Sequence, residues 1–439
     1  MRRLLALCLW IATLTAADLK SLTILHSNDL HSQSMPNSEG RGGFARLATA
    51  VQKERANCSA CLYLNAGDLV QGSPVSSIYE GVPIYRMANL LGFDAGTLGN
   101  HEFDYGWRRT RQFARIARFP IVSANVVDQN GKSITGKPYV IKNVGGLRVG
   151  IIGVVLGELV SRAFVSAASV EPWKVLPVVD TVRRYASQIK DKTDVIVVLG
   201  HLHDKEEVEA ILHEVPEVAI VVAGHSHTGY PQMMNVDGRV AVLLQAYGVE
   251  LGRLDLKIDP EAKTAHSAEW SKIPIDSRLS DAPRMTYAVK KWEDKISSLV
   301  DVPIGVATQY LDHDAQVKLF EQAMLETTKA DFVFFDPASA RNQHDIKPGQ
   351  VMARQIWEIF PYDNQVVMGK FKGSQLPAKV VKSKSIDPDR EYSLATTDFT
   401  ATNQSAPTQL GTTGLEFKVI GRAQRDLILN WIKQKRTIP

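Results

Sequence analysis

Short apolar runs alternate with amphipathic segments over the first two-thirds of the chain. Most runs are β-branched or apolar and are bounded by Gly or polar residues, a pattern that predicts buried β-strands. The predicted strands cover residues 22–26, 60–64, 95–98, 149–155, 195–199, 219–222 and 240–244. Helical patterns lie between them, at residues 41–55, 82–91, 178–190 and 206–213. Strands that alternate with helices predict an α/β fold with a largely buried sheet.

One longer amphipathic helix is expected at residues 283–300. Its apolar residues recur near helical spacing, at Met285, Ala288, Trp292, Ile296 and Leu299. We interpret residues 281–301 as a connecting helix. It would join a first domain at residues 18–280 to a smaller α/β domain at residues 302–439.

Composition adds little to the prediction of fold and function. The chain has 439 residues, 44% hydrophobic and 22% charged, which is ordinary globular composition for about two or three domains. Lys+Arg 51 against Asp+Glu 47 gives a net charge of +4. Spread over a chain of this length, that balance gives no sign of nucleic-acid binding, so nucleic acid is not expected among the partners.

The N-terminus has the order of a secretory signal peptide. Arg2 and Arg3 precede a short apolar run, and small residues follow up to Ala17. We predict that residues 1–17 are cleaved and that the protein is secreted or periplasmic. No later segment is long and apolar enough to span a bilayer, and the basic, polar stretch 431–439 lacks the pattern of a lipid-anchor signal. We therefore expect no membrane anchor.

Two of the three cysteines, Cys58 and Cys61, lie in the predicted mature chain. Export permits them to pair in a small loop, although the sequence leaves their pairing open. A structural zinc would need two more ligands, and none sits nearby at the spacing of a zinc ribbon.

Polar residues of the kind that bind metals follow five of the predicted strands. In chain order they are Asp29 and His31, Asp68, Asn100, His201, and His225 with His227. In open α/β sheets, ligands bind outside the carboxyl ends of strands, so we expect these side chains to meet. Each one alone is a weak signal, because Gly-Asp is usually a turn and a lone His is usually structural. The ordered set has no packing explanation.

This set resembles the calcineurin-like metallophosphoesterases. More closely, it is similar to the 5′-nucleotidase family, which also includes UDP-sugar hydrolases and cyclic-nucleotide phosphodiesterases. The resemblance rests on residues 22–31, 65–72, 98–106, 197–201 and 222–227, covers nearly all of 22–252 and continues more weakly over 330–398. It implies an α/β fold in which a metallophosphoesterase β-sandwich is flanked by helices and followed by a smaller α/β C-terminal domain.

The resemblance also implies two divalent metal ions as cofactors, bridged by Asp68. Asp29, His31 and His227 would complete one site, and Asn100, His201 and His225 the other. Mixed nitrogen and oxygen ligands suit Zn²⁺, Mn²⁺ or a similar ion better than Ca²⁺. Carboxylates can hold two cations about 3.5–4 Å apart, the spacing of two-metal phosphatases.

Two further residues are assigned to catalysis. His101 follows the ligand Asn100, so we expect it to stabilise the transition state or to protonate the leaving oxygen. Asp104 would orient that imidazole. Glu102, Phe103, His26 and His203 are interpreted as structural.

In the family the C-terminal domain binds the nucleoside. Arg341, Tyr362 and Phe399 match the family's substrate residues, but residues 336–341 lack the family's Asn and glycines. Residues 302–340 contain no Arg, and no Gly-Gly-Asp-Gly stretch occurs in 400–410. Tyr362 and Phe399 could stack on a base; the alternative is that both are ordinary core aromatics.

The leading hypothesis is a secreted, metal-dependent phosphohydrolase whose partner is a small phosphate ester, most simply a nucleoside 5′-phosphate. One alternative is a relative with another ester, such as a UDP-sugar, a cyclic nucleotide, a sugar phosphate or the bond cleaved by thiosulfohydrolases. A second alternative is a non-catalytic metal-binding protein. The sequence leaves the native metals and the oligomeric state open.

Overall fold

The computed structural model describes residues 18–158, 173–203, 205–341, 345–382, 385–401, 410–411 and 414–439. The predicted signal peptide at 1–17 lies outside these residues. No helix in these ranges is long and apolar enough to cross a membrane.

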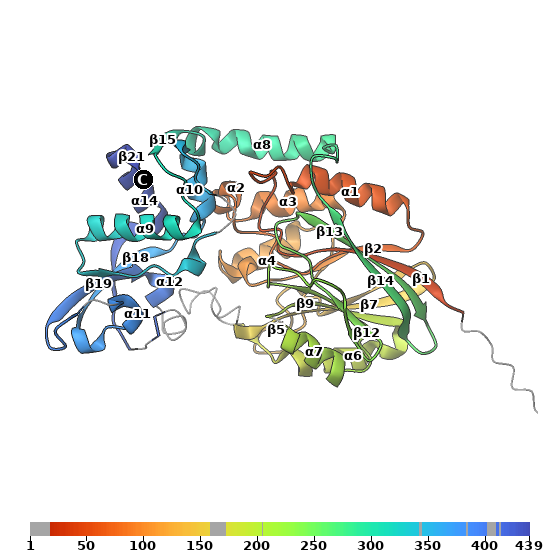
Figure 1. Cartoon of the computed structure of the whole chain (residues 1–439). Helices are drawn as coiled ribbons and strands as arrows, with labels where there is room; N and C mark the ends of the chain where they lie inside the picture. The colour runs from red at the N-terminus through yellow and green to blue at the C-terminus, as the bar shows by residue number, and fades with distance from the viewer. Residues whose placement is uncertain are drawn as a thin grey trace, which may run out of the picture.

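Two six-stranded sheets form the first unit (Figure 1). The first sheet has the order β14 (Thr264–Pro274), β13 (Glu250–Asp259), β1 (Lys20–Ser27), β2 (Cys61–Asn65), β3 (Ala95–Thr97) and β4 (Ile121–Val122). The second has the order β11 (Met234–Val236), β12 (Arg239–Val242), β10 (Ile220–Gly224), β9 (Val195–His201), β7 (Leu147–Val155) and β6 (Tyr139–Val144). The central strands of both sheets run parallel, so their carboxyl ends share one edge.

The two sheets pack face to face. One buried cluster contains Ile24 and Leu64 from the first sheet and Ile151 and Val197 from the second. Leu25, the next residue of β1, belongs instead to the cluster under the helices. Strands with apolar side chains on both faces explain why the sequence showed continuous apolar runs and not alternation.

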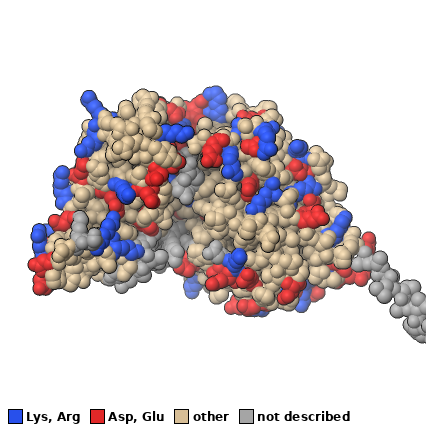
Figure 2. Space-filling model, viewed as in Figure 1, with Lys and Arg blue, Asp and Glu red and all other residues tan. Residues whose placement is uncertain are grey.

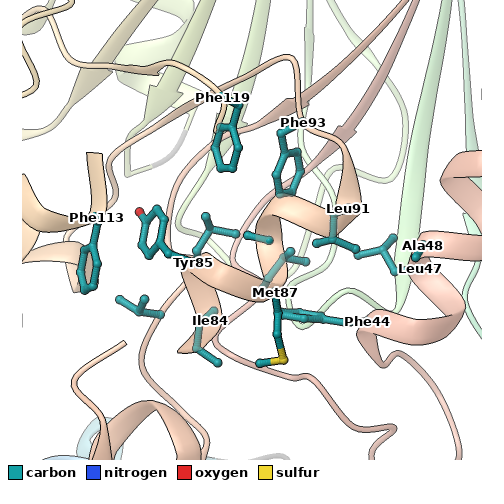
Figure 3. Close-up of a cluster of buried hydrophobic side chains, with 14 of the residues drawn as sticks. Phe44, Leu47, Ala48, Ile84, Tyr85, Met87, Leu91, Phe93, Phe113 and Phe119 are labelled. Carbon is teal, nitrogen blue, oxygen red and sulfur yellow. The ribbon is translucent and has the colours of Figure 1, made fainter. Parts of the chain in front are cut away.

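Helices cover the outer face of each sheet. On the first sheet lie α1 (Phe44–Ala56), α2 (Pro74–Ile78), α3 (Val82–Leu91), α4 (Trp107–Ile116) and α8 (Pro283–Val300). On the second lie α6 (Val178–Ile189) and α7 (Lys205–Glu214). Aromatic side chains fill the layer beneath α3: Tyr85 and Phe113 stack with their ring centres 4.4 Å apart (Figure 3).

The smaller unit contains two further sheets. One has the order β17 (Gly349–Met352), β15 (Pro303–Ala307) and β21 (Thr437–Ile438); the other has the order β16 (Phe332–Val333), β19 (Glu391–Thr397), β18 (Gln365–Lys372) and β20 (Lys418–Ala423). Its helices include α9 (His313–Thr328), α10 (Ala353–Ile359), α11 (Ala378–Val381), α12 (Asp398–Ala401) and α14 (Gln424–Lys435). These elements enclose two apolar clusters of their own.

The predicted fold class is confirmed: a sandwich of two sheets flanked by helices precedes a smaller α/β unit. The predicted helix at 283–300 matches α8, whose residues Met285, Ile296 and Val300 pack into the core of the first unit. The expected boundaries of the two domains stay predictions. Cys58 and Cys61 form a disulfide between α1 and β2.

Candidate metal centre

The seven predicted ligands converge at the shared carboxyl edge of the two sheets. Each lies at or just after the end of a strand: Asp29 and His31 after β1, Asp68 after β2, Asn100 after β3, His201 at the end of β9, and His225 and His227 after β10. Pairing of β9 with β10 places His201 opposite Gly224, one residue before His225. The parallel register therefore brings ligands from distant parts of the sequence to one place.

One group of four side chains contains Asp29, His31, Asp68 and His227, with candidate ligand atoms all within 4.8 Å of one another. His31 Nε2 lies 3.7 Å from Asp68 Oδ2 and 2.8 Å from His227 Nε2. Asp29 Oδ1 lies 3.8 Å from His227 Nε2. These are the four residues predicted for one metal site.

A second group contains Asp68, His201 and His225. His201 Nε2 lies 3.2 Å from Asp68 Oδ2 and 3.0 Å from Asn100 Oδ1. Its other ring nitrogen, Nδ1, lies 2.9 Å from the carbonyl oxygen of Ala66, which leaves Nε2 directed at the ligand cluster. Asp68 thus belongs to both groups.

The arrangement leaves buried polar atoms that divalent cations would satisfy. Within the described residues, Asp29 Oδ1, Asp68 Oδ2 and His225 Nδ1 are buried and form no hydrogen bond. Buried polar groups are normally paired, and a buried carboxylate is costly without a nearby positive charge. The seven side chains therefore fit two divalent cations that share Asp68.

The backbone at the ligands is strained. Asp29, His31, Asp68, His225 and His227 all have positive φ, between 43° and 94°. For residues other than glycine this region is uncommon, and such residues cluster at functional sites. The sharp turns after the strands are what aim consecutive polar side chains into one small volume.

Glu102 holds the loops that carry the predicted bridging ligand. Its carboxylate accepts hydrogen bonds from the backbone N–H groups of Asp68 (3.0 Å), Leu69 (2.9 Å) and Gly99 (2.6 Å). Gly99 cannot carry a side chain, since a Cβ there would lie 2.1 Å from Asp68 Oδ1. Glu102 is thus structural, as predicted, but it acts directly on the backbone of the metal centre.

His101 and Asp104 form a pair beside the cluster. His101 Nδ1 lies 2.7 Å from Asp104 Oδ2, and the backbone N–H of His101 donates to Asp68 Oδ1. Burial disfavours a charged imidazole, but Asp104 and Asp68 outweigh it and raise the pKa of His101. For Asp68 itself, burial opposes ionisation, but His201 and His101 hold its pKa well below the ordinary value.

Arg341 reaches into the centre from the smaller unit. Its Nη2 donates to Gln71 Oε1 at 2.5 Å and lies 3.5 Å from His31 Nδ1, while Nη1 donates to the hydroxyl of Tyr247 at 3.4 Å. Arg341 Nε and Gln71 Nε2 are buried donors without an acceptor among the described residues. Two such donors side by side can receive an anionic oxygen.

Tyr362 lies at the same junction. Its ring centre is 6.0 Å from that of His101 and 5.5 Å from the guanidinium carbon of Arg341. The loop that carries it is held by Arg425, which donates to the carbonyl oxygens of Phe360, Pro361 and Tyr362. Tyr362 therefore lies beside His101 and Arg341, at the edge of the metal centre.

Phe399 lies in α12, after β19. Its backbone N–H donates to Asp398 Oδ1, which also accepts from the backbone of Gln365, three residues after Tyr362. The structure therefore places Phe399 close in the fold to the Tyr362 loop.

Comparisons with known proteins agree with this geometry. Residues 22–229 match the calcineurin-like phosphoesterase family model, and residues 300–380 match the model of the 5′-nucleotidase C-terminal domain. The snake venom 5′-nucleotidase of Gloydius brevicauda is 31% identical over 357 residues, which cover 73% of this chain and 59% of that protein. The chain belongs to the 5′-nucleotidase family. It spans about three-fifths of the length of that relative.

Solved structures share the fold of this 5′-nucleotidase family member. A 5′-nucleotidase precursor from Thermus thermophilus superimposes with a TM-score of 0.83 at 21% identity, covering 95% of this chain and 97% of that one. The sulfate thiohydrolase SoxB of the same organism superimposes with a TM-score of 0.77 at 17% identity, covering 95% of this chain and 94% of that one. At these identities the likeness concerns the fold and leaves the bond that is cleaved undecided.

Two residues of the centre were missed by the sequence reasoning. Tyr247 lies with its hydroxyl 3.1 Å from His227 Nδ1, and Gln71 holds Arg341. Both have φ of 71°. Tyr247 follows a predicted strand, as the ligands do, so the same strand-end rule could have found it. Gln71 lies six residues after β2 and offered no comparable signal.

Proposed function

We propose that this chain is a metal-dependent phosphohydrolase that cleaves nucleoside 5′-phosphates or similar small phosphate esters. The observation that carries the proposal is the position of Asp68, whose carboxylate belongs to both ligand groups. A shared carboxylate is what a two-metal phosphoesterase requires. Family membership supports the same reaction class.

The ligand roles in this proposal follow the two groups. Asp29, His31 and His227 would hold one cation, Asn100, His201 and His225 the other, and Asp68 both. When bound, Zn²⁺, Mn²⁺ or similar ions would supply Lewis acidity, stabilising charge on phosphoryl oxygens and making a neighbouring water more acidic. Tyr247 would fix the ring of His227, because its hydroxyl can accept a hydrogen bond from Nδ1–H and leave Nε2 for the cluster.

His101 would act on the leaving group. With Nδ1 bonded to Asp104, the nitrogen that remains for the substrate is Nε2. Asp104 and Asp68 raise the pKa of His101, so the folded protein holds the proton of this imidazole more tightly than a free imidazole would. A protonated imidazole at this position can donate to the ester oxygen as the bond breaks, and Asp104 stabilises its charge.

The substrate would lie between the two units. Arg341 and Gln71 offer buried donors for phosphoryl oxygens, and Tyr362 offers a ring near His101. Phe399 would provide a second aromatic face for a base. Because the sequence lacks the family's additional Arg and glycine-rich stretch, we expect weak affinity for nucleotides and little preference among bases.

A hydrolysis screen of the purified mature chain tests the proposal. AMP, GMP, UMP, a UDP-sugar and p-nitrophenyl phosphate are each supplied with Mn²⁺ or Zn²⁺, and released phosphate is measured. Asp68→Ala should lose both metal ions by elemental analysis and all activity, whereas Asp191→Ala, an exposed carboxylate, should change neither. Tight retention of two ions by Asp68→Ala would contradict the bridging role.

The same screen separates the alternative functions. Fold likeness to SoxB is the observation behind a thiosulfohydrolase. A metal-loaded chain that cleaves a thiosulfonate and no phosphate ester would establish that alternative. A metal-loaded chain that cleaves neither would favour the binding protein.

We also propose that the protein is exported from the cytoplasm. The predicted signal peptide is the main support, and the Cys58–Cys61 disulfide suits an oxidising compartment. N-terminal sequencing of protein from the cell exterior or periplasm should find Asp18 or a residue beside it first. A cytosolic protein that retains Met1 would contradict export.

A further inference from the structure

Away from the metal centre, two adjoining surface cavities form one groove across α3. The larger has a volume of about 550 Å³ and lies between α3 and α8. The smaller, of about 390 Å³, lies between α3 and the end of α4. They lie next to each other, since Arg86 and Leu90 line both, and we treat them together as one groove.

The groove is lined by cations and by no carboxylate among the described residues. Arg86 lies at its centre, Arg118 at one end, and Arg284 and Lys291 at the other. Within the described part of the chain, none of the four has an ion-pair partner. Elsewhere, positive and negative side chains are interspersed over the face shown in Figure 2.

The acidic residues of the same helices are already paired with other cations. Glu293 of α8 lies 2.9 Å from Arg354, and Asp294 lies 2.6 Å from Lys290. Asp94, after α3, pairs with Arg55. The positive charges of the four groove cations are therefore not neutralised by nearby carboxylates. The net charge of the whole chain does not reveal this local excess of positive charge.

Specific contacts between helices hold the walls of the groove in place. The amide of Asn89 donates to the carbonyl oxygen of Ile116 and accepts from the backbone N–H of Arg118, which fixes the end of α4 against α3. Trp292 of α8 has Arg86 and Lys295 over its ring, at 6.0 Å and 4.4 Å from its centre. The cation–π contact of Arg86 holds this central charge against the wall formed by Trp292.

An exposed aromatic ring borders this row of charges. Tyr287 lines the larger cavity and is 72% exposed. In the described structure it has neither a hydrogen bond nor a ring contact. A row of cations beside an available aromatic ring is the arrangement that binds single-stranded nucleic acid, in which phosphates meet the cations and a base stacks on the ring.

We propose that this groove binds a single-stranded polynucleotide, with phosphates at Arg86, Arg118, Arg284 and Lys291 and a base on Tyr287. The site is separate from the metal centre and binds the strand whether or not metals are present. A sulfated polysaccharide would match the charges but has no base to stack. A lipid surface would meet a protruding face more readily than cations that line a hollow.

Fluorescence anisotropy of a 12-nucleotide oligothymidylate with a fluorescein at its 5′ end tests the proposal. The full chain is titrated into the oligonucleotide in the presence of a chelator, which keeps the metal centre empty. Arg86→Glu with Lys291→Glu should weaken binding at least tenfold and flatten its salt dependence, since fewer phosphates are neutralised. Lys132→Glu with Lys192→Glu, exposed positions elsewhere, should change binding little. Tyr287→Ala should weaken binding about tenfold without altering the salt dependence.

Other outcomes overturn the proposal. Equal binding by the groove variant and its charge-matched control would show that the groove is not the site. If Tyr287→Ala binds the oligonucleotide as tightly as the original chain does, and heparin at the same concentration of negative charge displaces the oligonucleotide, the ligand is a sulfated glycan. Binding to anionic phosphatidylserine vesicles without binding to the oligonucleotide would assign a membrane surface. Arg86→Gln with Lys291→Gln, checked by thermal unfolding, gives the same readout if charge reversal prevents folding.

Discussion

Arg341 Nη2 donates a 2.5 Å hydrogen bond to Gln71 Oε1 across 270 residues of sequence. The bond joins the smaller unit to the loop after Asp68. Arg341→Ala should lower kcat/KM about ten- to a hundredfold for AMP and for p-nitrophenyl phosphate alike, because loss of a charge-assisted hydrogen bond costs about 1.5–3 kcal/mol. Steady-state kinetics at saturating metal measure the loss.

Gln71→Ala should cause a smaller loss in the same direction, since the guanidinium would remain but be held less firmly. Lys370→Ala, an exposed cation of the smaller unit, serves as the control. A loss confined to AMP would show that Arg341 contacts the nucleoside and not the phosphate.

Glu102→Gln should weaken metal binding. An amide has one acceptor oxygen where the carboxylate has two, so it cannot satisfy the N–H groups of Asp68, Leu69 and Gly99 together. We expect metal affinity to fall roughly 10–100-fold, as for other residues that orient ligands. Competition with a chelating dye measures it.

Activity of Glu102→Gln should largely return at saturating metal, because the predicted ligands themselves are unchanged. Activity that stays low with both sites filled would show that Glu102 serves the reaction in another way.

His101→Ala should retain both metal ions and lose about 10²–10⁴-fold in kcat, the range of a general acid. Asp104→Asn should lose less, because Asp104 acts through its 2.7 Å contact with His101 Nδ1. Elemental analysis and kcat are measured on the same samples. Loss of metal from His101→Ala without any other effect would make it a ligand.

Tyr362→Ala should raise KM for nucleotides several-fold and leave hydrolysis of p-nitrophenyl phosphate nearly unchanged, since an aryl phosphate needs only the metal centre and Arg341. Phe399→Ala should act in the same direction if its ring faces the base. Strong purine selectivity with a low-micromolar KM for AMP would reveal nucleoside contacts beyond these two rings.

Glu358 makes stability depend on pH. Burial raises the pKa of its carboxyl to about 7, and Arg354 only partly offsets this. The folded chain therefore holds the proton more tightly than the unfolded chain. Stability from this group is complete below its ordinary pKa, near 4.5, and is lost as pH rises toward 7.

Glu358→Gln should therefore unfold at a higher temperature than the original chain at pH 8, by an amount that corresponds to roughly 1–3 kcal/mol. The difference should shrink toward pH 4.5. Glu391→Gln, at an exposed position, should leave the pH profile of unfolding unchanged. Parallel profiles for the original chain and Glu358→Gln would contradict the raised pKa.

The sequence by itself determined seven strands of the first unit, the helices at 82–91 and 283–300, and the order of the seven candidate ligands. It did not reveal β13 and β14, which complete the first sheet. The features that it determined are local: an apolar run predicts a strand, and the polar residue after it lies at the strand's carboxyl end whatever the rest of the chain does. Asp68 could therefore be placed with the ligands before any distance was known.

Only the tertiary structure decided which distant residues meet. Arg341 reaches Gln71, Tyr247 supports His227, and Arg86 lies beside Arg118 and Lys291 because separate elements dock against one another. No local pattern encodes such contacts, since they depend on the packing of whole units. The net charge of +4 likewise could not show where the charges gather, because summing over a sequence discards their positions in space.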